Sequence, residues 1–177
     1  MEKSLKSIAT NYGLYLGIAL SILTILVYVF NLELFISPIY IMSIMIATIA
    51  FGLISIFKIK QLFSGYINFK DAFKSYFIVA VIGLGISSLV TFVLFNFIDV
   101  ESSEIIKEKT IEKFVEMLKS VNTSDQDISD SMKKIEKENL YSFSNVLQRL
   151  VINYLLPITI IGLISAAFIK KTNPDTE

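Results

Sequence analysis

Four long stretches of the chain contain no charged residue: Ser7–Leu32, Leu34–Phe57, Ser75–Ile98 and Leu150–Ile169. Each of them is at least 20 residues long. An α-helix needs about 20 apolar residues to cross a hydrocarbon core of roughly 30 Å. The pattern therefore predicts an all-α membrane protein with four transmembrane helices.

Polar and turn-forming residues between these stretches predict where the helices begin and end. Ser37 followed by Pro38 is typical of a helix start, because the serine can cap the helix and the proline lacks an N–H that would be left unbonded. We expect the second span to run from Pro38 to about Phe57, after a tight turn over Asn31–Ile36. Gly65 is the expected turn residue of the following loop.

The segment 66–77, just before the third span, has two interpretations. Its aromatic residues recur at helical spacing, with charged residues between them: Phe69, Phe73, Tyr76 and Phe77, against Lys70, Asp71 and Lys74. The first interpretation is a short amphipathic helix that lies at the cytoplasmic membrane interface. The second is a plain extension of span three, with lysine side chains that reach toward water.

Small residues at four-residue spacing predict close contacts between the spans. Glycine, serine and alanine at such positions allow helix backbones to approach each other in a membrane. We expect helix packing through Gly13, Gly17 and Ser21 on span one, Gly83 and Ser87 on span three, and Gly162 and Ala166 on span four. Contacts within one chain are favoured over a homodimer interface. Pro157 predicts a kink in span four, since it cannot donate to the carbonyl of Asn153.

Residues 99–149, between spans three and four, predict a helical hairpin. Ser102 and Ser103 are positioned to cap a helix over Glu104–Val121, and Ser124 to cap a second one over Asp125–Glu138. Both helices carry an apolar stripe. Because two short helices bury little surface alone, the stripes predict binding to the membrane surface, a second copy or a partner. The candidate partner-binding residues are Phe114, Leu118, Met132 and Ile135. The alternative, which we favour for the charged faces, is simple solvation.

Lysines predict the orientation of the chain. Basic residues collect on the cytoplasmic side of membrane proteins, and they cluster at the N-terminus, in the loop between spans two and three, and at Lys170–Lys171. With four spans these segments share one side, so both termini are expected in the cytoplasm. Residues 1–98 then hold spans one to three, 99–149 form an extracytoplasmic insert, and 150–177 hold span four and its tail. The insert contains 8 basic and 11 acidic residues.

Composition removes most chemistries. The sequence contains no cysteine and no histidine, so thiol nucleophiles, the commonest general base and the commonest transition-metal ligand are absent. No ionisable residue lies within the four uncharged stretches, which argues against ion-coupled transport. Glu108, Glu112 and Glu116 share a helix face, but a solvated acidic face is favoured over a divalent-ion site. We expect no enzyme activity and no cofactor, and the zero net charge gives no case for nucleic acid.

Three further features stand out: Asn11-Tyr12-Gly13 at the start of span one, Gly65-x-x-x-Phe69-Lys70-x-Ala72-Phe73 before span three, and a last span that begins near Tyr154. In these features the chain resembles a bacterial domain-of-unknown-function family of small four-span inner-membrane proteins. The resemblance implies four spans, a helical insert and a bacterial inner-membrane location, with no catalytic residues. The preference for lysine over arginine, with only one arginine among 16 basic residues, fits a bacterial AT-rich genome.

Two classes of function remain. The first is a non-catalytic accessory or structural membrane protein, embedded in the lipid bilayer, whose external hairpin docks another membrane protein or a second copy. The second is a passive channel or small-solute carrier formed by an oligomer. The first is our prediction, because no polar path is evident within a single chain.

Overall fold

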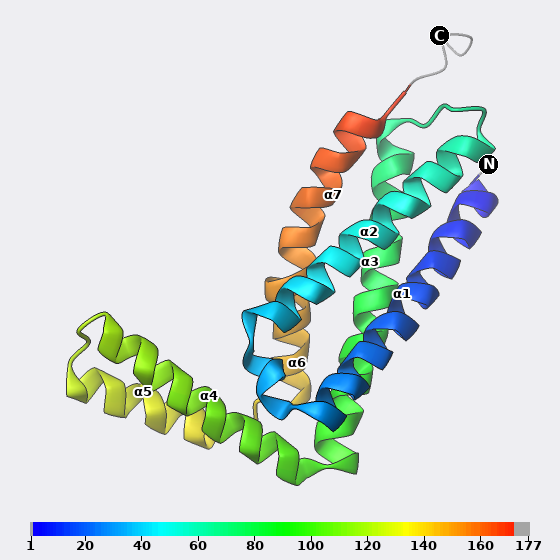
Figure 1. The fold of residues 1–177 in the computed structure, drawn as a ribbon. Helices are drawn as coiled ribbons and strands as arrows, with labels where there is room; N and C mark the ends of the chain where they lie inside the picture. Colours follow the sequence, from blue (N-terminus) through cyan, green and yellow to red (C-terminus); the bar gives the residue numbers. More distant parts are fainter. Residues whose placement is uncertain (1, 172–177) are drawn as a thin grey trace.

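The four uncharged stretches are helical in the computed structural model, which describes residues 2–171 (Figure 1). Spans one to three are α1 (Glu2–Phe30), α2 (Pro38–Leu62) and α3 (Phe69–Val93), which continues as the π-helical segment η2 (Leu94–Ile98). Span four joins α6 (Phe143–Gln148), the π-helical segment η3 (Arg149–Leu155) and α7 (Leu156–Ile169). All four are long and apolar enough to cross a membrane. The prediction of an all-α protein with four such helices is confirmed over the described range; residues 172–177 of the predicted tail lie outside it.

The predicted start of span two is correct. Ser37 accepts a hydrogen bond from the Ile39 N–H at 3.3 Å, and Pro38 is the first residue of α2. The preceding turn is a short 3₁₀ helix, η1 (Leu32–Ile36), capped by Asn31. The helix α2 extends beyond the expected Phe57 because the apolar pattern continues, with intervening lysines, to Leu62.

Span three contains no break at its start. Asn68 caps α3 by accepting a hydrogen bond from the Asp71 N–H at 2.8 Å, and the helix runs without interruption to Val93. The rings of Phe69, Phe73 and Phe77 stack along one side of it, with centroids 6.5 Å and 5.7 Å apart. The segment is thus continuous with the helix of span three from Phe69 onward. The loop before it turns at Gly65, which has a φ of +87°.

The segments rich in lysine lie together at one end of the bundle. The loop between α2 and α3 is hydrogen-bonded to the chain after α7, since the Ile67 N–H donates to the Lys171 carbonyl at 3.0 Å and the Lys171 N–H to the Ile67 carbonyl at 2.8 Å. The Lys60 ammonium also donates to the carbonyl of Ile169 at 2.8 Å. The described start of α1 lies at this same end (Figure 1). We call it the basic end.

Two further helices leave the opposite end of the bundle. These are α4 (Val100–Ser120) and α5 (Asp125–Lys137), which lie side by side, run in opposite directions and project away from the spans (Figure 1). We call residues 100–137 the arm. The cap predicted for its second helix is correct, since Ser124 accepts from the Asp127 N–H at 3.3 Å.

The predicted start of the first arm helix at Glu104 is wrong. The helix α4 begins at Val100, and its cap is Asp99 rather than Ser102 or Ser103. One Asp99 oxygen accepts from the Ser102 N–H at 3.0 Å and the other from the Ser102 hydroxyl at 2.6 Å. An aspartate caps a helix at least as well as a serine, and Asp99 reaches the free N–H groups first along the chain.

The disturbance predicted at Pro157 is a π-helical segment. Because Pro157 has no N–H, the carbonyl of Asn153 loses its α-helical donor. The segment η3 ends at Leu155, two residues before the proline. The Leu156 N–H donates to the carbonyl of Val151, five residues earlier. Such π-helical turns are rare and often occur at functional sites. Arg149 is the first residue of this segment.

Candidate functional site

Glycines on spans one and three lie in a close contact between these two helices. A Cβ atom added to Gly13 would lie 2.8 Å from the Cβ of Ile82, and one added to Gly17 would lie 2.7 Å from the Cδ1 of Ile86. On the other side of the same contact, a Cβ on Gly83 would collide with Leu16. The predicted packing glycines of span one therefore lie against span three, and that of span three lies against span one, within the same chain.

The other predicted packing residues are also inside the bundle. Ser21 donates to the carbonyl of Gly17 at 2.7 Å, so its hydroxyl is satisfied by its own helix. Ser87 and Ala166 are buried on α3 and α7. Gly162 faces Tyr76 of α3, where an added Cβ would lie 2.5 Å from the ring.

Tyr76 is the centre of the contact among α2, α3 and α7, and sequence reasoning placed it elsewhere. Its ring is fully buried between Gly162 and Gly52, and a Cβ on Gly52 would also lie 2.5 Å from it. Gly52 has no small neighbour four residues away in the sequence, apart from Thr48, so the spacing rule did not select it. The Tyr76 hydroxyl is buried and has no hydrogen-bond partner among the described residues.

Other polar side chains in the spans are satisfied in pairs. Thr24 of α1 and Tyr40 of α2 are 3.0 Å apart through their hydroxyl oxygens. Ser55 of α2 and Ser75 of α3 are 2.7 Å apart in the same way. These pairs join neighbouring helices, and they leave little free hydrogen-bonding capacity in the middle of the bundle.

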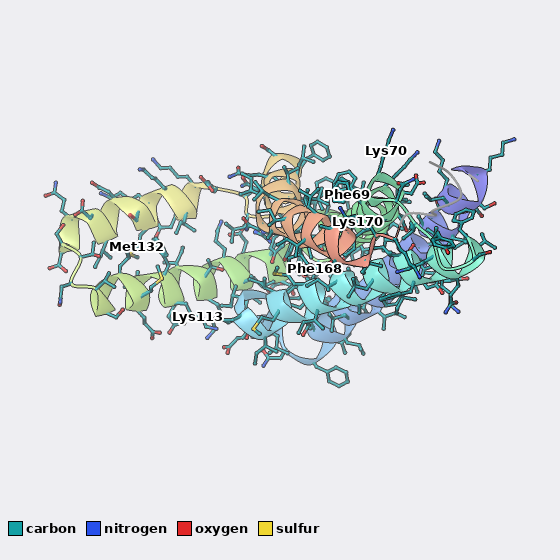
Figure 2. The ribbon with its side chains drawn as sticks, turned by 90° about the horizontal axis from the view of Figure 1, so that it is seen from above. Phe69, Lys70, Lys113, Met132, Phe168 and Lys170 are labelled. Atoms are coloured by element: carbon teal, nitrogen blue, oxygen red, sulfur yellow. The ribbon has the colours of Figure 1, made fainter. Side chains whose placement is uncertain are left out.

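The predicted partner-binding residues line the contact between the two arm helices. Phe114 and Leu118 of α4 and Met132 and Ile135 of α5 are all half-buried in the single chain. Figure 2 shows Met132 between the two helices and Lys113 on the side of α4 that faces away from α5. The apolar stripes are thus used first to hold the arm together, and the faces left for contact are mainly charged.

The arm is attached to the bundle through its base. Ile106 is 2% exposed and packs in a small second core with Leu94, Phe95 and Tyr141. The Lys109 ammonium lies 3.1 Å from the Glu33 carboxylate, and the pairing with Glu33 raises the pKa of Lys109.

Asp99 links the arm base to span one. The Tyr28 hydroxyl donates to Asp99 at 2.7 Å. Hydrogen bonds from the Ser102 hydroxyl, the Ser102 N–H and Tyr28 hold the pKa of the Asp99 carboxyl below its usual range. The carboxylate is therefore charged at neutral pH and serves both as a helix cap and as an anchor.

A cavity of about 210 Å³ lies beneath the arm base, between α2, α3 and η3. Its walls combine apolar side chains from η1, α2, α3 and α4 with polar groups from several helices. The polar lining residues are Tyr40, Ser87, Ser88, Thr91, Thr110, Tyr141, Arg149, Asn153 and Tyr154. Thr91 and Thr110 donate to carbonyls of their own helices, and Tyr40 is paired with Thr24. The other polar lining residues therefore have more free donors and acceptors for hydrogen bonds to a ligand.

Arg149 is the charged residue in this lining, and sequence reasoning did not select it. Its guanidinium lies 5.4 Å from the centroid of the Tyr141 ring and donates to the Leu140 carbonyl at 3.4 Å. Burial raises the pKa of Tyr141 to about 12, although the nearby Arg149 opposes the rise, so the phenol is neutral. The available signal was that the chain's only arginine stands at the edge of an uncharged span.

Within residues 2–171, no group of three or more acidic side chains is placed so that it could hold a metal ion. Glu112 is instead 3.6 Å from the ammonium of Lys109. Glu108, Glu112 and Glu116 line a shallow hollow between α4 and α5 together with Lys119.

The helices and their apolar surfaces define a small multi-span membrane protein. The family model described as "Protein of unknown function (DUF4199)" matches residues 11–171, and the chain belongs to this family. The resemblance stated from the sequence is therefore confirmed. The match covers span one from residue 11, the other three spans and the arm. Comparison with curated proteins and with solved structures finds no match.

Proposed function

We propose that this chain is a non-catalytic accessory protein of the bacterial inner membrane, whose arm lies outside the cytoplasm and docks a partner protein. The observation that carries the proposal is the arm itself. It is joined to the bundle only at its base, around Ile106, and its far part extends beyond the spans (Figure 1). A helical pair that added only stability to the bundle would gain more by packing along it.

The orientation follows from the basic end. Lysines of the N-terminus, of the loop after α2 and of the chain after α7 all belong to that end, and the positive-inside rule assigns such an end to the cytoplasm. The arm leaves from the opposite end and therefore faces the extracytoplasmic side.

Because the chain has no cysteine, single-cysteine variants test this orientation directly. Gln61→Cys in the last turn of α2 and Ser120→Cys at the end of α4 are both exposed positions. In intact cells stripped of their outer membrane, a membrane-impermeant maleimide should label Ser120→Cys and leave Gln61→Cys unlabelled until the membrane is opened. The reverse pattern contradicts the proposed orientation.

The partner is expected to be a protein with a polar, charged contact surface. The apolar stripes of the arm face each other, and the outer faces of α4 and α5 carry charges of both signs. Contacts between such surfaces give specificity and salt-sensitive association more than high affinity. We therefore expect a partner that dissociates as the salt concentration rises.

Cross-linking in intact membranes tests the docking role. Replacing residues 113–134 with a short Gly/Ser turn removes the far part of the arm and keeps its buried base, and flexible closure of this kind costs little. The four spans should still insert, and a cross-linked partner seen with the parent should be lost. Lys113→Glu, which reverses a charge on the outer face, should weaken the cross-link without disturbing the stripe. A shortened arm that keeps every cross-link refutes the docking role.

A further inference from the structure

Arg149 has hydrogen-bonding capacity that the chain does not use. A guanidinium carries five N–H donors and a permanent charge. Within the described residues it forms no ion pair with a carboxylate. It donates to the Leu140 carbonyl at 3.4 Å and interacts with the side chain of Tyr141, which leaves other N–H donors unused. A half-buried charge of this kind is costly unless an anion joins it.

Neutral donors surround the same cavity. Ser88, Asn153 and Tyr154 line it, and their side chains hydrogen-bond to no residue in the described part of the chain. Together with Arg149 they offer an oxyanion one full charge and several neutral donors. The rest of the wall includes apolar side chains, with Leu84 and Ile106 among them.

The cavity opens at the surface of the bundle, near the end from which the arm leaves. The helix α2 packs on α7 at the level of Gly52 and Gly162, but toward the arm it does not pack closely on α6 or η3. Ile41 and Asn153 line the cavity and are exposed, so its mouth lies between α2 and η3. Arg149 directly precedes the uncharged stretch 150–169, which places it where that span leaves the hydrocarbon core.

We propose that the cavity binds a phospholipid of the surrounding bilayer, with the lipid phosphate held by Arg149. A phosphodiester carries a single negative charge, which matches the single guanidinium, and arginine binds phosphate through two parallel hydrogen bonds. A volume of about 210 Å³ is smaller than a typical pocket for a whole drug-sized ligand, roughly 300–1,000 Å³. It therefore takes the headgroup region, while the acyl chains lie along exposed apolar residues such as Ile41 and Ile152.

This site is separate from the docking role of the arm, so each can fail without the other. The test uses the full chain, purified in a maltoside detergent and stripped of lipid. Phosphatidylglycerol, diacylglycerol, oleate and inorganic phosphate are added separately. Bound lipid is counted by native mass spectrometry, and the melting temperature is followed in parallel. We expect one phosphatidylglycerol per chain and a rise in melting temperature, with much weaker effects of the other three probes.

Variants assign the binding to the cavity. Arg149→Gln should weaken phosphatidylglycerol binding roughly tenfold to a hundredfold, the cost of losing hydrogen bonds to a charged group. Arg149→Lys keeps the positive charge but loses the two parallel hydrogen bonds of the guanidinium. Its affinity for phosphatidylglycerol should lie between that of Arg149→Gln and that of the parent. Lys109→Gln is the matched control, because it also removes one positive charge near the arm base. In the parent, this charge is paired with Glu33. The control variant should bind lipid like the parent.

A second variant keeps the proposal testable if Arg149→Gln folds poorly. Ser88→Trp leaves Arg149 in place and fills the cavity, so it should also lose the bound lipid. Equal binding of phosphatidylglycerol to the parent, Arg149→Gln and Ser88→Trp overturns the site. Equal binding of diacylglycerol shows an apolar slot that ignores the phosphate and overturns it as well. Tighter Arg149-dependent binding of oleate or of inorganic phosphate overturns the assignment to a phospholipid.

Discussion

The bundle of spans and the arm are both helical, but they are held together in different ways. In the bundle, the helices pack against each other at glycines. The ring of Tyr76 fills the space between Gly52 and Gly162 so closely that a methyl group added to either glycine would overlap with it. In the arm, the facing apolar side chains are only half-buried, apart from Ile128. The stability of the bundle thus depends on close complementarity between its helix surfaces. The stability of the arm depends on the short apolar stripes between α4 and α5 and on the packing of its base against the bundle.

The difference predicts two levels of stability in one chain. Membrane helices associate through close packing rather than through a hydrophobic drive, so the bundle is sensitive to the volume of each contact residue. A helix of 13 residues such as α5 is marginal alone in water. We therefore expect the arm to open locally while the spans stay folded, as regions with few buried contacts do.

The largest effect is expected at Tyr76. Tyr76→Ala removes a fully buried ring from the contact of three helices and should lower the stability of the bundle by about 3–5 kcal/mol. Tyr76→Phe is the matched control, because it removes only a hydroxyl that has no partner within the described residues. Its melting temperature in detergent should equal or exceed that of the parent. A Phe variant that melts well below the parent would show that the hydroxyl is bonded after all.

A smaller effect is expected at Gly17. Gly17→Ile forces a branched side chain against Ile86 and should cost about 1–3 kcal/mol, the usual range for overpacking. Gly85→Ile is its control on the facing helix, where an added Cβ meets nothing within 4 Å. Thermal melting in detergent should separate the two variants, with insertion into the membrane unchanged in both. Equal melting temperatures would mean that α1 and α3 do not meet at Gly17.

A substitution in the arm should destabilise the arm and leave the bundle unchanged. Ile128→Ala removes the most buried side chain of α5, which is 6% exposed, and a buried Ile→Ala change costs about 2 kcal/mol or more. Amide hydrogen exchange in α5 should become faster, while the spans keep their protection and melting temperature. Met117→Ala, at a position 54% exposed on α4, should leave exchange unchanged. Loss of protection in the spans as well would show that the two regions unfold as one unit.

Patterns that are local in sequence were predicted well. Runs without charge gave the four spans because the length of a membrane helix is fixed by the bilayer. Ser37–Pro38 and Ser124 marked helix starts because a cap acts within three residues. The error at the start of α4 has the same local origin: Asp99 was assigned to the insert without a capping role, and the cap was assigned to the serines that follow.

Features that require several helices to meet were not predicted. Gly52 carries no spacing signal, and its partner Tyr76 lies on another helix, so nothing in either sequence neighbourhood shows the contact. The cavity is lined by residues from η1, from η3 and from four further helices, α2, α3, α4 and α6. Arg149 stood at the boundary between the insert and the span. The apolar stripes of the insert were recognised, but which surface covers them depends on the antiparallel pairing of α4 with α5.

The smallest expected effect concerns pH at the junction of the two regions. Hydrogen bonds from Ser102 and Tyr28 lower the pKa of Asp99 below its usual 3.8. A carboxyl with a lowered pKa contributes stability that is present above its unfolded value and is lost as the pH falls through the folded value. The first turn of α4 should therefore loosen only below about pH 3.8, seen as faster exchange of the Ser102 and Ser103 amides. Asp99→Asn keeps a side chain that caps helices well but does not titrate. Its exchange should lack this acid-dependent step, and an unchanged step in the variant would assign it to another carboxyl.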